Sequence, residues 1–548
     1  MRDDNSKIMT KIQLQKIIKA LILARPGSYK ELSAVVRTGA GQFGQPSPEK
    51  SQLLSAYHSL LKNKKIKSSS VLEKLLIKRA VRTLSGVAVI TVLTKPYPCP
   101  GECIFCPTEV KMPKSYLSNE PAVMRAILND FDPYRQIKMR LRALKANGHK
   151  TDKVELIVIG GTWSVLDHQY QNWYIKRCFE ALNGRPSKNL LAAQKINETA
   201  KHRCIGLTLE TRPDYINEKE LIRMRELGCT RVELGVQHID NKILAFNKRG
   251  HTVQVSIRAI KLLKEAGFKV NLHLMLDLPI STPAKDLAMF KKIYTHPDWR
   301  PDMVKIYPCV VNERAELYNL WKKGKYKPYS AKQLRRLLVD IKKITPEYVR
   351  ITRLVRDIPK ESILAGNKIT NLRQLLADQA KDEGWVCRCI RCREVSRQEQ
   401  IKGGISNLKL KIRTYQASGG TEYFLSYESR DEKALYAFLR LRVNDKISPP
   451  AGGGEVAKGD RGGGSFIPEL KGAALIRELH TYGELTKLGQ RGSAQHQGLG
   501  QKLLKEAESI VQKQEIKKIA VIAGVGVRKY YEKFGYKLEG TYMVKYIS

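Results

Sequence analysis

The sequence predicts an α/β protein of several domains: a basic helical N-terminal region, a partial (β/α)6 barrel, and a mixed α/β domain. Three observations lead to this prediction. Short apolar runs alternate with polar helical stretches through the middle of the chain, and a second, antiparallel pattern follows toward the C-terminus. Residues 1–95 hold 18 Lys/Arg and 5 Asp/Glu. A chain of 548 residues is long enough for two to four domains.

Changes in pattern set the expected domain boundaries. A Gly/Pro-rich loop breaks the N-terminal helices at Gly39–Pro48, and a low-complexity segment at 448–464 reads as an insertion between strands. The expected units are a basic helical region at 1–80, a barrel at 81–345, a connector at 346–404 and a mixed α/β domain at 405–548.

The barrel prediction depends on strand, helix and strand following one another repeatedly, which favours parallel βα units. Six such units make an incomplete barrel with a lateral opening. The apolar runs are Leu84–Leu93, Val154–Ile159, Cys204–Leu209, Arg231–Gly235, Val270–Leu276 and Met303–Tyr307.

Polar or glycine-rich segments follow these runs directly. A cysteine loop follows the first run, Gly160-Gly161-Thr162 the second, Glu210-Thr211-Arg212 the third, and Gln237 the fourth. The loops at the carboxyl ends of barrel strands all face one mouth, where function collects. We therefore expect these segments to share one site.

The cysteine loop carries Cys99, Cys103 and Cys106 in the spacing C-x3-C-x2-C. Thiolates on one short loop are the ligands that an iron–sulfur cluster requires. Three ligands on a four-iron cluster leave one iron free to bind another molecule. The spacing therefore favours a 4Fe-4S cluster over a zinc knuckle or buried structural thiols.

A second cysteine group is Cys387, Cys389 and Cys392, in the spacing C-x-C-x2-C. This spacing can surround one ion, and zinc is the predicted metal, although zinc prefers four ligands. A metal-free structural loop and a second cluster are the alternatives. The fourth ligand is not evident; Cys309 and a histidine both remain open.

The C-terminal region contains a glycine turn before a helix. Gln495-His496-Gln497-Gly498-Leu499-Gly500 leads into a helix that runs to about Gln514. Such a turn directs backbone N–H groups toward a ligand and can bind a pyrophosphate, although glycine turns also begin ordinary helices. A strand follows, and then a helix with Tyr530 and Tyr531.

These motifs resemble known families. The cysteine segment, with Phe105 before its last cysteine, resembles radical S-adenosylmethionine (SAM) enzymes, and the C-terminal motifs resemble the GNAT family of acetyltransferases. Residues 75–548 as a whole resemble the family of Elongator catalytic subunits in its single-chain archaeal and bacterial form. The matching phrases are Val81–Ala88, Glu210–Tyr215, Asn247–Thr252, Arg477–His480 and Gln495–Gly500.

The resemblance implies which residues bind the cofactors. SAM would bind the open iron, with Gly160, Gly161, Thr162, Glu210, Arg212 and Gln237 around it. Acetyl-CoA would contact Glu478, Leu479, His480, Gln495, His496, Gln497, Gly498, Leu499 and Gly500. Tyr530 and Tyr531 would lie beside the thioester. Since neighbouring residues of one helix face different ways, only one of these tyrosines is expected to touch it.

The resemblance also implies a reaction. A 5′-deoxyadenosyl radical would remove hydrogen from the methyl group of acetyl-CoA, and the carbon radical would add to carbon 5 of the wobble uridine in a tRNA anticodon. Hydrolysis would release CoA and leave 5-carboxymethyluridine. The expected partners are the tRNA anticodon loop, acetyl-CoA and an electron donor; a homodimer is one possible assembly.

Charge and cysteine usage agree with these expectations. The net charge of +45 indicates a polyanionic partner, and nucleic acid is favoured over anionic lipid because no basic amphipathic helix carries bulky aromatic residues. No apolar stretch approaches 18 residues, and no secretory signal is evident. Clustered cysteines suit a reducing compartment, so we expect a cytoplasmic protein without a membrane span.

Two other functions fit parts of the sequence. A protein lysine acetyltransferase with a non-catalytic radical-SAM-like domain would explain the C-terminal motifs, but it predicts decay of the cluster ligands, and all three cysteines are intact. A non-catalytic tRNA-binding scaffold would explain the charge, but it accounts for neither cofactor site.

Overall fold

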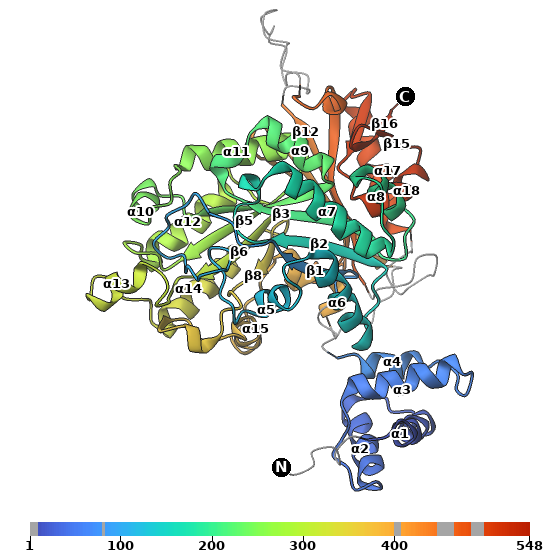
Figure 1. The fold of residues 1–548 in the computed structure, drawn as a ribbon. Coiled ribbons are helices and arrows are strands. Elements are labelled where there is room, and N and C mark those ends of the chain that lie inside the picture. Colours follow the sequence, from blue (N-terminus) through green and yellow to red (C-terminus); the bar gives the residue numbers. More distant parts are fainter. Residues whose placement is uncertain (1–8, 79–82, 399–406, 446–464, 484–497, 548) are drawn as a thin grey trace, which may run out of the picture.

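Two seven-stranded sheets and a separate helical bundle make up the fold (Figure 1). The computed structural model describes residues 9–78, 83–398, 407–445, 465–483 and 498–547. The predicted Gly-rich insertion at 448–464 and the residues Gln495, His496 and Gln497 lie outside these described residues.

The N-terminal region is a bundle of four helices with its own core. Ile18, Leu21, Tyr57 and Leu60 are fully buried at its centre. The bundle meets the barrel where the backbone N–H of Lys78 donates to the carbonyl of Asn147 (3.2 Å). Figure 1 shows the bundle at one end of the molecule, below α6. Its helices are α1 (Lys11–Ala24), α2 (Tyr29–Gly41), α3 (Lys50–Lys62) and α4 (Ser70–Leu76).

The first sheet confirms the predicted parallel barrel. Its strands follow one another in the order β1-β2-β3-β4-β5-β6-β8, and every neighbouring pair is parallel. The six predicted apolar runs correspond to the first six strands. The strands are β1 (Ala88–Leu93), β2 (Lys153–Ile159), β3 (Arg203–Thr211), β4 (Cys229–Gln237), β5 (Lys269–Leu276), β6 (Met303–Pro308) and β8 (Arg350–Arg353).

The seventh strand corrects the expected count of six. β8 pairs with β6 from Met303 and Arg350 onward, inside the segment that was expected to be a connector. Its sequence, Arg-Ile-Thr-Arg, has only one apolar residue, so it gives no apolar run. A two-stranded sheet of β7 (Val310–Val311) and β9 (Ala365–Gly366) lies beside this region.

Helices join the parallel strands. The chain between β1 and β2 forms two helices, α5 (Pro121–Ile127) and α6 (Pro133–Ala146), and Asp130 and Phe131 adopt positive φ between them. The remaining helices are α7 (His168–Asn183), α8 (Leu190–Asn197), α9 (Glu218–Glu226), α10 (Asn241–Phe246), α11 (Val253–Glu265), α12 (Pro283–Thr295), α13 (Leu317–Lys322), α14 (Ala331–Lys343), α15 (Leu372–Asp382) and α16 (Ile390–Arg393). None of the helices that the structure describes is both long and apolar enough to span a membrane.

The second sheet is mixed, as predicted. Its strand order is β10-β11-β12-β13-β14-β16-β15, and all pairs are antiparallel except β13 with β14. The elements are β10 (Lys409–Gln416), β11 (Gly420–Glu428), β12 (Leu435–Asn444), β13 (Ala473–Thr481), α17 (Leu499–Lys513), β14 (Lys518–Val521), α18 (Arg528–Glu532), β15 (Lys537–Glu539) and β16 (Tyr542–Tyr546).

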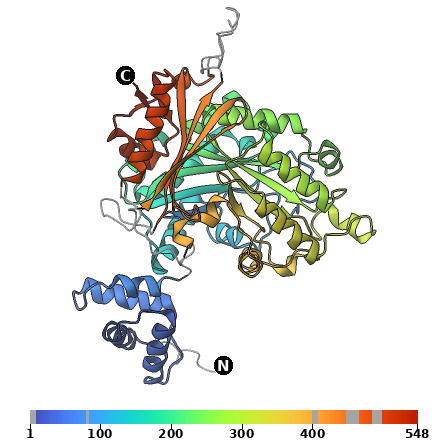
Figure 2. The same ribbon diagram turned by 180° about the vertical axis from the view of Figure 1, so that it is seen from behind.

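One hydrophobic core joins the two sheets. Leu475 and Tyr542 of the mixed sheet belong to the same buried cluster as Val232 and Leu272 of the barrel. Seen from behind, the mixed sheet lies beside the barrel (Figure 2). A second cluster fills the far side of the mixed sheet, under α17. The barrel and the mixed sheet are therefore one packed body.

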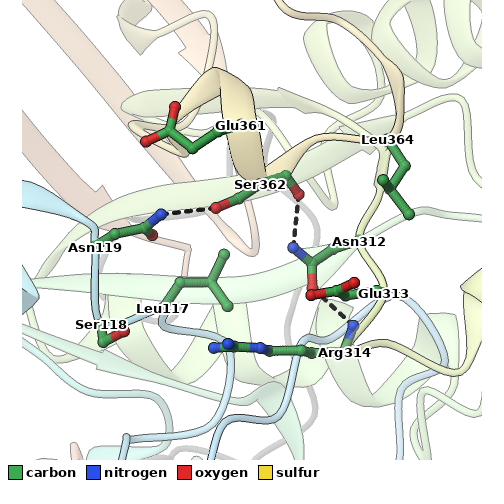
Figure 3. Close-up of a pocket in the computed structure, with 9 residues that line it drawn as sticks. All are labelled: Leu117, Ser118, Asn119, Asn312, Glu313, Arg314, Glu361, Ser362 and Leu364. Atoms are coloured by element: carbon green, nitrogen blue, oxygen red, sulfur yellow. Dashed lines mark hydrogen bonds between the residues drawn. The ribbon is translucent and has the colours of Figure 1, made fainter.

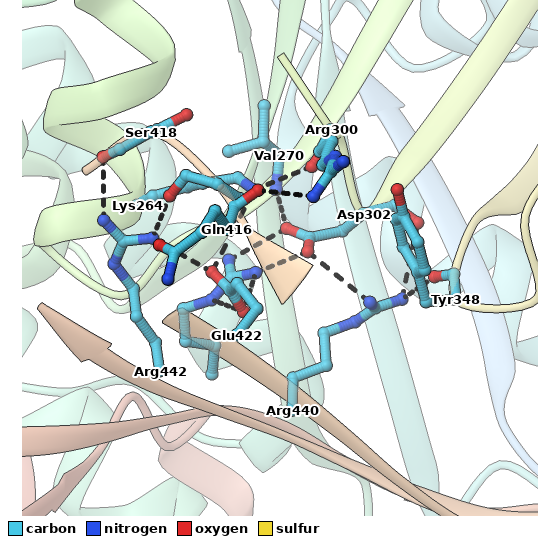
Figure 4. Close-up of polar contacts among 12 residues, drawn as sticks. Lys264, Val270, Arg300, Asp302, Tyr348, Gln416, Ser418, Glu422, Arg440 and Arg442 are labelled. Atoms are coloured by element: carbon cyan, nitrogen blue, oxygen red, sulfur yellow. Dashed lines mark hydrogen bonds and ion pairs between the residues drawn. The ribbon is translucent and has the colours of Figure 1, made fainter. Parts of the chain in front are cut away.

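A buried carboxylate ties this interface. Asp302 lies just before β6 and is fully buried, and it accepts hydrogen bonds from Arg477 of β13 (2.9 Å) and from the backbone N–H of Val270 (2.9 Å). Arg440 of β12 lies 3.6 Å away (Figure 4). Burial alone would raise the pKa of Asp302, but Arg477 and then Arg440 hold the pKa below its ordinary value. Glu422 binds Arg477 from the other side (3.0 Å).

Replacing Asp302 by asparagine should destabilise the protein strongly. The change leaves Arg477 and Arg440 buried beside a neutral group, which costs about 3–5 kcal/mol of unfolding free energy. Asp298→Asn is the matched control, because the Asp298 side chain is 47% exposed and its carboxylate lies 3.6 Å from the His296 ring. The control should change the unfolding free energy by less than about 0.5 kcal/mol. Urea unfolding of both variants measures the difference, and equal effects would contradict this role of Asp302.

Candidate functional site

The three barrel cysteines lie on the loop that follows β1, at the carboxyl edge of the sheet. Cys103 is buried, and Cys99 and Cys106 are partly buried. The Cys99 sulfur lies 3.8 Å from the hydroxyl of Thr162, which follows β2. Burial and the neighbouring Cys103 raise the pKa of the Cys106 thiol to about 11. In the protein without bound metal this thiol is therefore protonated at neutral pH.

The glycine pair after β2 sits beside this loop, and its backbone requires glycine. Gly160 and Gly161 have φ of +141° and +99°. A Cβ at Gly160 would lie 2.0 Å from the hydroxyl oxygen of Thr94, at the end of β1. The turn is therefore fixed against the start of the cysteine loop, with its backbone exposed to a ligand there.

The spread of the thiols distinguishes the two cysteine groups. Among the described residues, one group of three metal-ligating side chains has all its ligand atoms within 4.8 Å of one another: Cys387, Cys389 and Cys392. A zinc ion with bonds of about 2.3 Å needs such closely spaced sulfurs. Cys99, Cys103 and Cys106 do not meet that limit.

Other predicted residues reach the same edge of the barrel from β3 and β4. Glu210 accepts a hydrogen bond from the hydroxyl of Tyr116 (2.9 Å). Arg212 is buried and forms a fork with Asp214 (3.0 Å for both nitrogens). Gln237 has φ of +70°, an uncommon backbone for a residue other than glycine. The three residues therefore lie at the same carboxyl edge of the sheet as the cysteine loop, as the parallel topology predicts.

The barrel interior is polar between its two ends. Glu233 accepts hydrogen bonds from His273 (3.0 Å) and Asn271 (3.3 Å), and it pairs with Lys305. The other ring nitrogen of His273 lies 3.7 Å from Glu210. Toward the opposite end, Arg231 pairs with Glu155. A line of charged groups therefore runs through the barrel, and sequence patterns gave no sign of it.

A small polar pocket of about 150 Å³ lies near the cysteine loop (Figure 3). The amide of Asn119 donates to the hydroxyl of Ser362 (2.8 Å), and the amide of Asn312 donates to the Ser362 carbonyl (2.7 Å). Leu117, Arg314 and Glu361 complete its wall. This volume is too small for SAM or acetyl-CoA.

A larger cavity opens where β13 and β14 separate. β13 pairs with β12 as far as Thr481, but with β14 only as far as Ile476. The resulting gap holds a cavity of about 380 Å³. Glu478, Leu479, His480, Gly498, Leu499, Gly500, Tyr530 and Tyr531 all line it. The structure therefore brings together the predicted acetyl-CoA residues that it describes.

The start of α17 and the tyrosine helix meet in this cavity. Gly498 caps α17 with φ of +80°, and a Cβ there would meet no atom within 4 Å. A Cβ at Gly500 would lie 2.6 Å from the hydroxyl oxygen of Tyr530, so that hydroxyl lies over the first turn of α17. Burial raises the pKa of Tyr530 to about 12, which keeps its hydroxyl protonated. Tyr531 is more deeply buried and packs against Tyr536.

The carboxylate of Glu478 is engaged in ion pairs. Arg440 donates to it (3.0 Å), and the Lys269 ammonium lies 3.8 Å away. Burial opposes ionisation of Glu478, but Lys269 and Arg440 keep its pKa below the ordinary value. His480 is hydrogen-bonded to the carbonyl of Ser85, before β1 (2.9 Å). Residues of the mixed sheet and of the barrel therefore contact each other in the wall of this cavity.

The sequence motifs did not predict the barrel side of this cavity. Lys153, Arg203 and Lys269 line it, and each is the first residue of a barrel strand. Residues at the amino ends of barrel strands usually serve stability, so the barrel pattern does not mark these positions as a site. Their repeated positive charge at the same strand position was the available signal. Burial lowers the pKa of Lys153 to about 8.

The second cysteine group lies at α16, beside β8. Cys387 and Cys389 are buried, and the Lys342 ammonium lies 3.7 Å from the Cys392 sulfur. Cys389 has a pKa well below the ordinary value, chiefly because the Cys387 and Cys392 thiols hydrogen-bond to it. Cys309 belongs to a different buried cluster, with Ile104 and Tyr326, so it is not part of this group.

Family comparisons agree with this division of the chain. Residues 97–290 match the Radical SAM superfamily, and residues 301–382 match the Radical_SAM C-terminal domain. Residues 469–545 match the acetyltransferase (GNAT) domain.

Similar proteins extend over most of the chain. The tRNA uridine(34) acetyltransferase of Methanocaldococcus jannaschii is 48% identical, over 87% of this chain and 88% of that protein. The protein of the same name from Dehalococcoides mccartyi is 43% identical, over 86% and 100%. Elongator complex protein 3 of Homo sapiens is 40% identical, over 86% of each chain. The solved structure of archaeal Methanocaldococcus infernus Elp3 with an N-terminal deletion (1–46) superposes with a TM-score of 0.72, at 44% identity, and covers 85% of this chain and 100% of that one.

Proposed function

Because the chain belongs to the family of tRNA uridine(34) acetyltransferases and Elongator complex protein 3, we propose that it modifies the wobble uridine of tRNA. In this reaction, radical SAM chemistry acts on acetyl-CoA, and a group derived from its acetyl moiety is transferred to the uridine. The product is uridine with a carboxymethyl group on carbon 5.

The observation that carries this proposal is the wall shared by the two domains. The acetyl-CoA cavity is lined by the mixed sheet on one side and by the amino ends of β2, β3 and β5 on the other. The cysteine loop and the glycine pair lie at the carboxyl ends of the same sheet. For example, β3 runs from Arg203 in the cavity to Glu210 near the cysteine loop, a length of about 23 Å. Such a shared scaffold supports one enzyme with two coupled sites.

The same wall weighs against a protein lysine acetyltransferase. Such an enzyme must admit a lysine side chain from another protein to the thioester. Here the barrel covers the mixed sheet at that face, and Gly524 packs so closely on β3 that a Cβ there would lie 2.1 Å from the carbonyl oxygen of Ile205.

The residues present fit the two implied cofactors. Cys99, Cys103 and Cys106 would hold the 4Fe-4S cluster, and the backbone at Gly160 and Gly161 would admit SAM. When bound, the cluster and SAM supply a radical able to act on an unactivated carbon, which no side chain can do. The cavity residues orient the acetyl group, and the protonated Tyr530 hydroxyl can donate to the CoA sulfur. An external electron donor is required; the oligomeric state remains a prediction.

The basic N-terminal bundle would bind the tRNA. Lys62, Lys64, Lys65 and Lys67 are exposed at the end of α3 and beyond it. Exposed lysines gathered on one end of a helix suit contacts with phosphates. A single-stranded anticodon loop offers splayed bases to the barrel mouth.

We also propose that Cys387, Cys389 and Cys392 bind zinc. Their mutual spacing suits one ion, and thiolates are the ligands that zinc prefers. Glu394, two residues after Cys392, pairs with Arg350 of β8, and Arg393 pairs with Glu428 of β11. Zinc here would stabilise the junction between the two sheets.

Replacing Lys62, Lys64, Lys65 and Lys67 by alanine should weaken tRNA binding and flatten its salt dependence, because fewer counterions are released. Each lost phosphate contact reduces the slope of log affinity against log salt by about 0.7–0.9. Filter binding at several salt concentrations measures the slope. Lys30, on α2, serves as a control for charge loss elsewhere on the bundle. An unchanged slope would place the tRNA on another surface.

Metal analysis tests the zinc proposal. Protein with Cys99, Cys103 and Cys106 replaced by alanine should still contain about one zinc per chain. Adding Cys389→Ala should remove that zinc and lower the thermal midpoint. If the protein without Cys99, Cys103 and Cys106 contained no zinc, the zinc proposal would be wrong and Cys387, Cys389 and Cys392 would form a metal-free loop.

The two cofactor sites should be separable by mutation, yet both should be needed for product. Gly498→Glu places a carboxylate where α17 would receive phosphate, so it should abolish acetyl-CoA binding and leave SAM cleavage intact. Cys106→Ala should do the reverse. Neither should form carboxymethyluridine, measured by mass spectrometry of tRNA nucleosides.

Gly498→Asn is the control for the first variant, because asparagine tolerates positive φ and adds no charge. It should keep most acetyl-CoA binding. Carboxymethyluridine from the Gly498→Glu protein, with acetyl-CoA binding shown to be absent, would overturn acetyl-CoA as the carbon donor. Full SAM cleavage by Cys106→Ala would overturn the radical SAM site.

A further inference from the structure

Two buried arginines border the cysteine loop. Arg249 is 6% exposed and Arg212 is 5% exposed. Nη1 of Arg249 donates to the sulfur of Cys103 at 3.2 Å, and Nη2 donates to the carbonyl of Gly235 at the end of β4. Arg249 therefore touches a predicted cluster ligand directly, from the loop that follows α10.

Arg212 holds Arg249 in place. Nη2 of Arg212 donates to the backbone carbonyl of Arg249 (2.8 Å), while its Nε and Nη2 bind Asp214. Its Nη1 is buried and has no hydrogen-bond partner among the described residues. A Cβ at Gly101 of the cysteine loop would lie 2.3 Å from that nitrogen. The loop therefore admits the guanidinium only because glycine stands there.

The local charge is not balanced by carboxylates. Within the described residues, no carboxylate lies within 4.0 Å of the Arg249 guanidinium, and Asp214 pairs with Arg212. Arg356, the third arginine near the loop, differs because it pairs with Glu120 (3.0 Å). A buried cation without a counter-ion is costly, so Arg249 is placed for a negative group that binds at the cysteines.

We propose that Arg249 is the electrostatic partner of the iron–sulfur cluster and raises its reduction potential. A cluster held by three thiolates is negatively charged, and reduction adds one more negative charge. A cation and an N–H···S bond at Cys103 both favour the reduced form. Arg212 acts as a positioning residue for Arg249. This inference rests on the proposed cluster site.

The test compares Arg249→Gln, Arg249→Lys and Lys248→Gln in the full-length protein, reconstituted without oxygen. Lys248→Gln is the matched control. Lys248 is the neighbouring residue, its replacement removes the same single positive charge, and its side chain is exposed and pairs with Glu316 (2.7 Å). Iron and sulfide content are measured first, and then the midpoint potential by redox titration followed by electron paramagnetic resonance.

Arg249→Gln should retain iron and lower the ratio of reduced to oxidised cluster at least tenfold at a fixed potential, which is about 59 mV for one electron. Arg249→Lys, which keeps the charge, should fall between Arg249→Gln and the unaltered protein. Lys248→Gln should stay within twofold. Loss of iron from Arg249→Gln but not from Arg249→Lys, with both folded by circular dichroism, would also support the proposal.

Three results would overturn the proposal. The first is full iron content in Arg249→Gln with a ratio within twofold of the unaltered protein. The second is loss of iron from both Arg249 variants while they remain folded. Arg249→Lys keeps the positive charge, so on this proposal it should still bind the cluster. The third is an unaltered protein that binds no cluster; it would also remove the proposed function, whereas the first two leave that function standing.

Discussion

The contact on which the rest of the molecule depends is the buried carboxylate of Asp302. It lies just before β6 and binds Arg477 of the mixed sheet, while its backbone carbonyl accepts the N–H of Arg350 at the start of β8. One residue therefore fixes the position of the last barrel strand and of the acetyltransferase sheet. Because a buried carboxylate is costly without its cations, the two domains are stable in this arrangement only together.

This arrangement places candidate site residues at both ends of the barrel strands. In most barrels the amino ends serve stability and the carboxyl ends hold the site. Here Lys153 and Arg203 line the cavity between β13 and β14, while Gly160 and Glu210, at the other ends of the same strands, border the cysteine loop. The charged line of Glu155, Arg231, Glu233 and His273 fills the space between. The same strands therefore join the cavity to the cysteine loop.

Local patterns in the sequence predicted the strands and the motifs at their carboxyl ends, because apolar runs and glycine turns are short-range features. β8 could not be predicted in this way, since its Arg-Ile-Thr-Arg segment becomes a strand only through pairing with β6. The charged residues of the interface were equally hidden. Arg477 and Asp302 are 175 positions apart, and no local pattern indicates that either side chain is buried. Sequence motifs therefore predicted the cofactors, but only the tertiary packing shows how the barrel and the mixed sheet are arranged.

The separate core of the N-terminal bundle has an evolutionary consequence. Its buried residues form a cluster of their own, whereas the barrel and the mixed sheet share one. A recombination event between α4 and β1 could exchange the bundle and leave both remaining sheets folded. A break between β8 and β10 would instead separate Asp302 of the barrel from Arg477 of the mixed sheet, and each would lose its buried partner. The bundle is free to diverge by itself, whereas the barrel and the mixed sheet must be inherited as one.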